Sequence, residues 1–164
     1  LRRYQQLNER KEFIMADIGK NAFEPSNTTM SITPTAGNAW TVNAVSITPP
    51  AWDGGDAIDI TTLGNQEFRT KMAQTLKDIG ECSFDCHYDP SVFAGAPINK
   101  DATIVISIPN WGALTFYGYL RSLTPGSMEV GAAPTMSGTI TVTNTEISGT
   151  GSGRVITEKG PTWS

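Results

Sequence analysis

One stretch, residues 65–80, has the apolar spacing of an amphipathic helix and stands alone in a chain of short alternating patterns. Asn65 is placed to cap its start and Gly80 to end it. The apolar positions recur at i, i+4, i+8 and i+11, at Phe68, Met72, Leu76 and Ile79. We therefore predict one core-facing helix over residues 65–80. A single helix cannot cover a whole sheet system, so another copy of the chain is the leading candidate to bury the rest.

Alternating apolar and polar residues predict strands on both sides of this helix. Residues 104–108 and 114–121 flank the turn 109–112 and predict a hairpin. Residues 40–47 alternate with a change of phase at Asn43-Ala44, which predicts a bulged strand. The predicted fold class is mainly β: a β-sandwich or barrel with one flanking α-helix and extended terminal arms.

The length of 164 residues suits one domain with one core. We assign residues 39–147 to that β domain. Residues 1–38 form an N-terminal arm and linker, rich in Pro, Ser, Thr and Asn after residue 20, and residues 148–164 a flexible Gly-rich C-terminal tail. Only 17% of residues are charged, below the usual quarter, which suggests that partners cover some of the polar, uncharged surface.

The net charge of -4 is unevenly distributed. The first twenty residues carry five basic and three acidic side chains, so the remainder is acidic. Such a body disfavours sequence-specific DNA binding, which needs Lys and Arg against phosphates, and is compatible with DNA passing without being held. No apolar run approaches the roughly 18 residues of a membrane span, so we expect no membrane contact.

The two cysteines belong to a predicted strand that alternates strictly. Cys82, Phe84 and Cys86 share one face, and Ser83, Asp85 and His87 share the other. Four residue steps along an extended strand place the cysteine Cα atoms about 13 Å apart, too far for a disulfide. We predict buried, unbonded thiols, which also cannot converge with His87 on a metal.

The sequence contains no set of residues that argues for a catalytic or cofactor site. His87 is the only histidine, and it lies on a polar strand face. The run 149–153 lacks the spacing of a phosphate loop, and Asp53 and Asp56 lack the rest of a calcium loop. We therefore expect no enzyme, no cofactor and no metal.

The order of these pieces resembles the major tail tube protein of long-tailed (siphovirus-type) bacteriophages. The resemblance covers residues 39–147. It is carried by Trp40-Thr41-Val42, by the stretch IDITTLG at 58–64, by LKDIGECSF at 76–84 and by Tyr88-Asp89-Pro90. Two later strands, residues 116–125 and 136–143, are similar to the closing strands of that family.

The resemblance implies a structural virion protein that is assembled in the host cytoplasm and located in the tail. Six copies would form a ring, and stacked rings would form a conduit for DNA delivery. The implied partners are further copies of the chain, the tape measure protein in the lumen, tail terminator and tail-tip proteins, and DNA passing without sequence recognition. From the acidic balance we name Asp85 as a candidate for the lumen lining.

Two other function classes stay open. Trp52 and Trp111 fall in predicted loops and could stack on sugar rings, as in a carbohydrate-binding β-sandwich module. A tube protein of a contractile or effector-secretion system would share the fold but belong to another machine. An enzyme comes last, because the sequence supplies no catalytic set.

The start of the chain admits two hypotheses. Residues 1–14 are an upstream extension if Met15 is the true start, and we favour this hypothesis slightly. Alternatively, residues 1–20 are an arm that reaches an adjacent ring, with basic residues meeting acidic surface: Arg2, Arg3, Arg10 and Lys11.

Overall fold

The computed structural model describes residues 27–64, 66–149 and 151–164. Six strands form its body: β1 (Thr29–Pro34), β2 (Trp40–Thr48), β7 (Cys82–His87), β8 (Asp101–Ile108), β9 (Gly112–Pro125) and β10 (Thr135–Val142). The chain is mainly β with antiparallel pairing, so the predicted fold class is confirmed.

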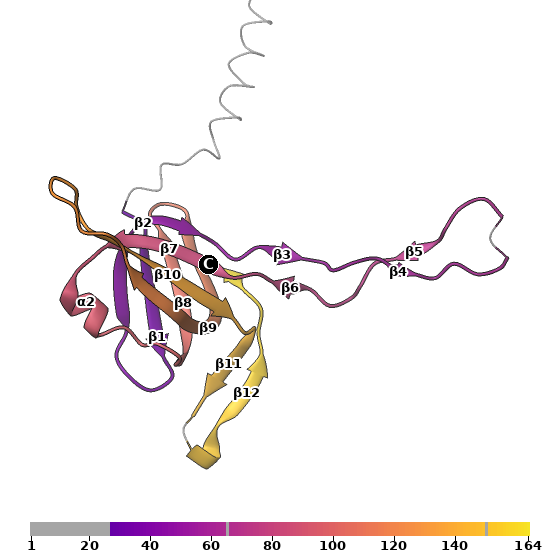
Figure 1. Cartoon of the computed structure of the whole chain (residues 1–164). Coiled ribbons are helices and arrows are strands. Elements are labelled where there is room, and N and C mark those ends of the chain that lie inside the picture. The colour runs from indigo at the N-terminus through magenta and orange to yellow at the C-terminus, as the bar shows by residue number, and fades with distance from the viewer. Residues whose placement is uncertain (1–26, 65, 150) are drawn as a thin grey trace, which may run out of the picture.

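The six strands close into a barrel (Figure 1). Their order is β10-β7-β2-β1-β8-β9, and β10 pairs again with β9, which completes the circle. A short strand, β13 (Thr162–Trp163), adds to the first part of β9. Closure pairs edges that would otherwise be open to other chains.

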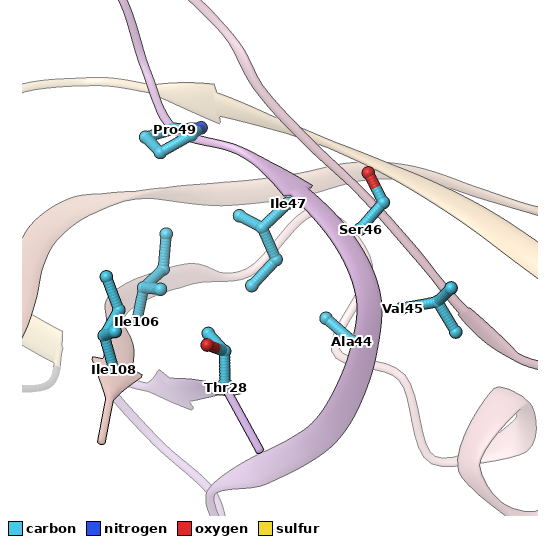
Figure 2. A pocket seen from close by; sticks show the side chains of 8 residues that line it. All are labelled: Thr28, Ala44, Val45, Ser46, Ile47, Pro49, Ile106 and Ile108. Atoms are coloured by element: carbon cyan, nitrogen blue, oxygen red, sulfur yellow. The ribbon is translucent and has the colours of Figure 1, made fainter. Parts of the chain in front are cut away.

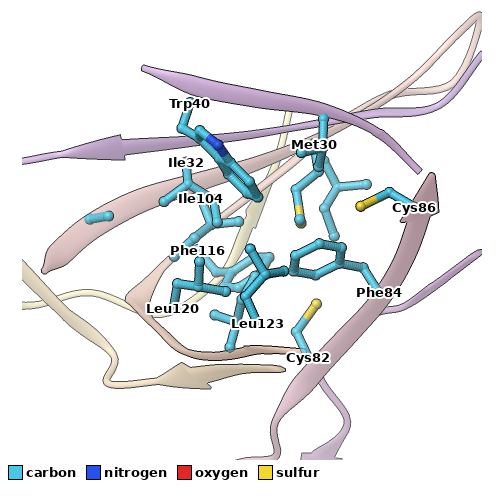
Figure 3. Packing of buried hydrophobic residues seen from close by; sticks show 14 of the residues in the cluster. Met30, Ile32, Trp40, Cys82, Phe84, Cys86, Ile104, Phe116, Leu120 and Leu123 are labelled. Atoms are coloured by element: carbon cyan, nitrogen blue, oxygen red, sulfur yellow. The ribbon is translucent and has the colours of Figure 1, made fainter. Parts of the chain in front are cut away.

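The core lies inside this barrel and is built from the inward half of each alternation. Met30 and Ile32 of β1, Ile104 of β8 and Phe116 of β9 are fully buried. Figure 3 shows Phe84 and Phe116 directed into the centre of the barrel. Gly138 of β10 leaves room for the Phe84 ring, because a Cβ at residue 138 would overlap it.

One end of the barrel is closed by the chain between β7 and β8, which contains the helix α2 (Pro90–Ala94). Asp89 caps α2 by accepting a hydrogen bond from the Ser91 amide at 2.8 Å. The Trp40 indole donates to the Val92 carbonyl at 2.8 Å. Tyr88, Val92 and Ala96 pack against the core at this end.

The predicted helix over residues 65–80 is wrong. The described residues there belong to an extended hairpin that contains β5 (Lys71–Met72) and β6 (Asp78–Ile79). The reason lies in the spacing, since Phe68, Met72 and Leu76 fall at i, i+4 and i+8, which also matches a strand with a period of two. The flanking helix of the fold is α2, at a different place in the chain.

Residues 1–38 were assigned to an N-terminal arm and linker, but residues 29–34 of that segment form β1 of the barrel. Met30 and Ile32 have no exposed surface, and β1 pairs with both β2 and β8. Its six residues, TMSITP, alternate strictly, but a flanking cluster of Pro, Thr and Asn obscured the pattern.

The C-terminal residues also have more structure than the predicted linker and tail. β11 (Thr145–Ser148) pairs with β12 (Val155–Glu158), and the turn η1 (Gly151–Gly153) lies between them. β13 then returns to the barrel, where the Ser164 amide donates to the Ala113 carbonyl at 3.0 Å.

Three local predictions are confirmed. The β8–β9 hairpin forms, with Ile108 opposite Gly112 and Asn110 at a positive φ of 66° in the turn. The β2–β7 register shifts between Ala44 and Ser46, as the phase change indicated. Cys82 and Cys86 are buried free thiols beside Phe84.

Candidate assembly surfaces

The most exposed apolar part of the described chain is the segment between β2 and β7, residues 49–81, which we call the arm. It leaves the barrel as a long thin hairpin (Figure 1). β3 (Trp52–Asp53) pairs with β6 at its root, and β4 (Ile58–Asp59) pairs with β5 further out. Few backbone bonds join its limbs, among them Gly80 N–H to Ala51 O at 2.8 Å and Ile60 N–H to Thr70 O at 3.0 Å.

The outer arm has one apolar and one charged face. Ile58 lies opposite Met72, and alternation adds Ile60 and Phe68 to the same side. The other side carries Asp59 opposite Lys71, with Arg69 Nη1 at 3.7 Å from the Asp59 carboxylate. The Thr61 hydroxyl and amide hydrogen bond to that carboxylate and lower the pKa of Asp59.

Apolar exposure in the arm is large. Phe68 is 79% exposed, Leu76 is 78% exposed, and Leu63 near the tip is fully exposed. A two-stranded ribbon that exposes side chains of this size gains little from its own folding. The arm therefore has the chemistry of a surface that becomes buried on association.

The arm root has one polar contact with the barrel and one between its own limbs. Glu81 accepts a hydrogen bond from Arg121 Nη1 of β9 at 2.6 Å. Within the arm, Lys77 lies 5.5 Å from the centre of the Trp52 ring. Asp53 lies opposite Asp78, a like-charge pair that weakens the root pairing. A hollow of about 250 Å³ separates the root from the C-terminal segment at Glu158 and Pro161.

A second candidate surface is the outer face of strands β2, β7, β10 and β9, which we call the polar face. Two rows of short polar residues cross it in register: Ser46, Asp85, Ser137 and Thr124, then Thr48, Ser83, Thr139 and Ser122. Asp85 is the only charged residue in either row, and its carboxylate accepts a hydrogen bond from Ser137 at 2.7 Å. The two rows are thus polar and weakly acidic, without Lys or Arg. The exposed Arg121 of β9 lies next to Ser122 at the margin of the face, where it pairs with Glu81.

The structure separates the residues considered for other functions. Trp52 belongs to the arm root, whereas Trp111 lies in the β8–β9 turn. His87 points outward from β7, away from the two buried cysteines. Burial raises the pKa of the Cys82 thiol to about 12, so this thiol is neutral at physiological pH. Among the described residues, His, Cys, Asp and Glu form no group of three that could hold a metal. In the same part of the chain, helices long and apolar enough to cross a membrane are absent.

The predicted basic residues at the start of the chain lie outside the described residues: Arg2, Arg3, Arg10 and Lys11. The arm is what sequence reasoning missed. Pro49-Pro50 and Gly54-Gly55 interrupt the chain before Ile58, and the even spacing of residues 68–76 is the signal that could have identified it as extended.

No protein-family model matches this chain, and no curated protein matches it. Solved structures do. A chain in the 6-fold symmetrised baseplate of the anti-feeding prophage aligns with a TM-score of 0.58 at 9% identity, over 75% of this chain and 93% of the other. A chain in the C6-symmetric tail of an empty gene transfer agent particle aligns with a TM-score of 0.51 at 11% identity, over 73% and 92%.

A chain in the virion of the native gene transfer agent aligns with a TM-score of 0.50 at 8% identity, over 87% of this chain and 99% of the other. At these identities the likeness concerns the fold alone. The chain has a fold that is found in phage-like tail and baseplate assemblies.

Proposed function

We propose that this chain is a structural subunit of a phage tail tube, in which hexameric rings stack into a conduit for DNA delivery. The fold likeness to tail and baseplate chains supports this proposal, and two of the similar structures have sixfold symmetry. The partners in this proposal are further copies of the chain, the tape measure protein, and the proteins that start and end the tail.

The single observation that carries the proposal is the arm with its exposed apolar face. A limb that runs from Trp52 to the tip spans about 40 Å when extended. At that length, β4 with Ile58 and β5 with Met72 lie outside the barrel of their own chain (Figure 1). A ribbon of this length that packs one face on a neighbour contributes an area near the roughly 800 Å² per partner of a standard interface.

The polar face supports the conduit part of the proposal. DNA moves past a wall quickly only if Lys and Arg do not hold its phosphates. The two rows of Ser and Thr offer no cation, and Asp85 adds a repelling charge. We assign the polar face to the lumen, with Asp85 as its acidic residue.

Two substitutions with equal solvent exposure test the role of the arm. Leu63 at the arm tip and Val130 in the β9–β10 loop are both fully exposed, so neither charge change should harm the barrel. We expect Leu63→Asp to prevent ring stacking in negative-stain electron micrographs and in sedimentation, while Val130→Asp assembles normally. Purified wild-type protein that stays monomeric even with tail-tip components, or tubes from Leu63→Asp, would contradict the proposal.

A second candidate is the tube of a contractile or secretion-type particle. The observation that favours it is the fold likeness to the anti-feeding prophage baseplate. Co-purification of a sheath protein with assembled particles would select this alternative. The carbohydrate-binding alternative gains no support, because Trp52 and Trp111 belong to different structural units.

A further inference from the structure

Two hollows are lined in part by residues of the arm. The larger has a volume of about 430 Å³, and Figure 2 shows the aliphatic side chains of Ala44, Ile47, Ile106 and Ile108 around it, whereas Val45 points away. A lining without charged groups does not select one kind of partner. The smaller hollow, of about 250 Å³, separates the arm root from the C-terminal segment, and we call it the root hollow. Its lining is mixed, so it can be matched to one chemistry.

The apolar part of the root hollow contains an aromatic ring. Trp52, which is 58% exposed, lines it together with Leu76, Ile79 and Pro161. Lys77 Nζ lies 5.5 Å from the centre of the Trp52 ring, so the ring already accepts a cation. A cavity of about 150 Å³ holds a benzene ring, so the root hollow has room for a planar group of that size.

The polar part of the root hollow offers acceptors that have no donor. Asn144 lines it, and its Oδ1 atom is buried without a hydrogen-bond partner in the described structure. Glu158 also lines it and has no ion pair among the described residues. The neighbouring Lys159 does not neutralise Glu158, because Glu146 holds its amine at 2.9 Å.

The arm root adds negative charge beside the root hollow. Asp53 lies opposite Asp78, and each of them adjoins in sequence a residue that lines the hollow. With Glu158 they make three carboxylates, whereas Lys77 is the one ammonium group among the described lining residues. The root hollow therefore has a surplus of negative charge and of acceptors, which suits a cationic donor.

An arginine side chain fits this set of groups. Its planar guanidinium stacks on aromatic rings and has five N–H donors for carboxylate and amide oxygens. Of the three arginines that the structure describes, Arg121 and Arg154 are held by carboxylates at 2.6 and 2.8 Å. The side chain of Arg69 in the outer arm is 80% exposed, and its contact with Asp59 is longer, at 3.7 Å. Arg69 is therefore the described arginine that is most available for a contact with another copy.

The Arg69 of the same chain cannot reach the root hollow. It lies nine residues before Asp78 (78 minus 69) along an extended limb, which places it about 30 Å from the root. A second copy must therefore supply the side chain. A domain of about 100 residues has a radius of gyration near 13 Å and so a width of roughly 30 Å, and copies placed side by side bring the outer arm of one to the root of the next.

We propose that the root hollow of one subunit binds the Arg69 guanidinium of a neighbouring subunit, which stacks on Trp52 and pairs with Glu158. This inference rests on the proposed function, because it names the place where the arm of one copy docks on the next. The recognition is electrostatic and planar, so a lysine at residue 69 replaces it only in part.

Charge reversal in the full-length protein tests the pair. Arg69→Glu should reduce the assembled fraction in sedimentation at least tenfold, and adding Glu158→Arg should restore it to within about twofold of wild type, because the pair forms again with opposite signs. Lys71→Glu is the matched control, since Lys71 lies on the same charged face of the arm. Glu158→Arg should not improve the assembly of Lys71→Glu. No rescue of Arg69→Glu, or equal rescue of both arm variants, would overturn the proposal.

The same measurements separate this inference from the proposed function. Wild-type protein that forms no assemblies would contradict both the tube and this contact. Wild-type assemblies that form equally well with Arg69→Gln would leave the tube standing and would remove the contact between Arg69 and the root hollow.

Cross-linking between two tagged copies makes the test independent of the charge variants. One copy carries Arg69→Cys, the other carries Glu158→Cys, and a short bismaleimide joins them, while Cys82 and Cys86 are buried and give little background. We expect the mixed product to form at least tenfold faster than with Lys100→Cys in place of Glu158→Cys, since Lys100 is equally exposed but lines a different hollow. Equal rates, or a product within one chain when a single copy carries both cysteines, would contradict docking between copies.

Discussion

The barrel and the arm both alternate apolar and polar residues, but the apolar side chains are buried in the barrel and exposed in the arm. In the barrel, Phe84 and Phe116 are at most 2% exposed, and the strands around them pair with neighbours on both sides. In the arm, Phe68 is 79% exposed, and the strand pairing of each limb, among the described residues, is with the other limb alone. Alternation alone therefore specifies an extended strand and does not specify whether its apolar face is buried within the same chain.

The difference lies in what each ribbon can pack against. A closed barrel surrounds the inward side chains with other strands, so burial stabilises it directly. A lone hairpin has no second layer and is marginal in water. The barrel sequence therefore determines the stability of the subunit, whereas in the function that we propose the arm sequence determines how the subunit associates.

The largest expected contrast is between two phenylalanine deletions. Phe84→Ala removes a ring that packs edge-on against Trp40, with centroids 6.3 Å apart, and should lower the free energy of unfolding by about 3–5 kcal/mol. Phe68→Ala should change it by less than about 0.5 kcal/mol. Urea unfolding monitored by fluorescence measures both, and similar losses would erase the distinction between barrel and arm.

The barrel should also resist added volume where the arm tolerates it. A Cβ on Gly138 would overlap the Phe84 ring, so Gly138→Ala should lower the free energy of unfolding by about 2 kcal/mol. At Gly54 in the arm a Cβ meets nothing within 4 Å, and Gly54→Ala should be neutral. Calorimetry of both variants compares them, and an unchanged Tm for Gly138→Ala would mean that the ring moves aside freely.

The barrel was predictable from sequence to the extent that its strands alternate without ambiguity. Residues 82–88 and the pair 104–108 and 114–121 met that condition. Their inward sets are buried, except that Tyr88 and Ile108 at the strand ends are half-buried. β1 was missed because a six-residue strand inside a Pro, Thr and Asn cluster resembles a linker. β2 follows it after a short loop, but its other partner, β8, is distant in sequence, and no local pattern records that second pairing.

The arm was not predictable in the same way. Spacings of four and eight residues satisfy both a helix and a strand, so Phe68, Met72 and Leu76 could not decide between them. Ile79, at i+11 from Phe68, fits the helical spacing and not the period of two, so it favoured the helix that the structure does not contain. For the row that contains Asp85, one feature was predictable and one was not. The outward direction of Asp85 follows from alternation. The alignment of Asp85 with Ser137 depends on a strand pairing between residues 52 apart in sequence.

The barrel should lose stability at high pH, and the arm offers no equivalent. Burial raises the pKa of Cys82 from 9.0 to about 12, so the folded state keeps the thiol neutral where the unfolded state ionises it. This contribution is fully present below pH 9 and is lost as the pH rises toward 12. At pH 10 the expected loss is about 1.4 kcal/mol. Urea midpoints at pH 8 and pH 10 measure it, and Cys82→Ala should lose less over this interval. Equal losses in the two proteins would contradict a buried thiol.

The smallest expected effect lies at the junction of the two regions. Arg121 and Glu81 form an ion pair at 2.6 Å where the arm joins β7, but their side chains are 60% and 51% exposed. Solvent screens such a pair, so Arg121→Ala should lower the free energy of unfolding by less than about 1 kcal/mol. Its effect should instead be local, because the pair holds one arm limb beside the barrel.

We expect Arg121→Ala to speed amide hydrogen exchange at the arm root, around Asp78 to Glu81, by about two- to fivefold, with less effect at high salt. Arg154→Ala is the matched control, since Arg154 contacts Asp101 at 2.8 Å with similar exposure but belongs to the C-terminal hairpin. Equal exchange in both variants would mean that the pairing of β3 with β6, and not this ion pair, sets the direction in which the arm leaves the barrel.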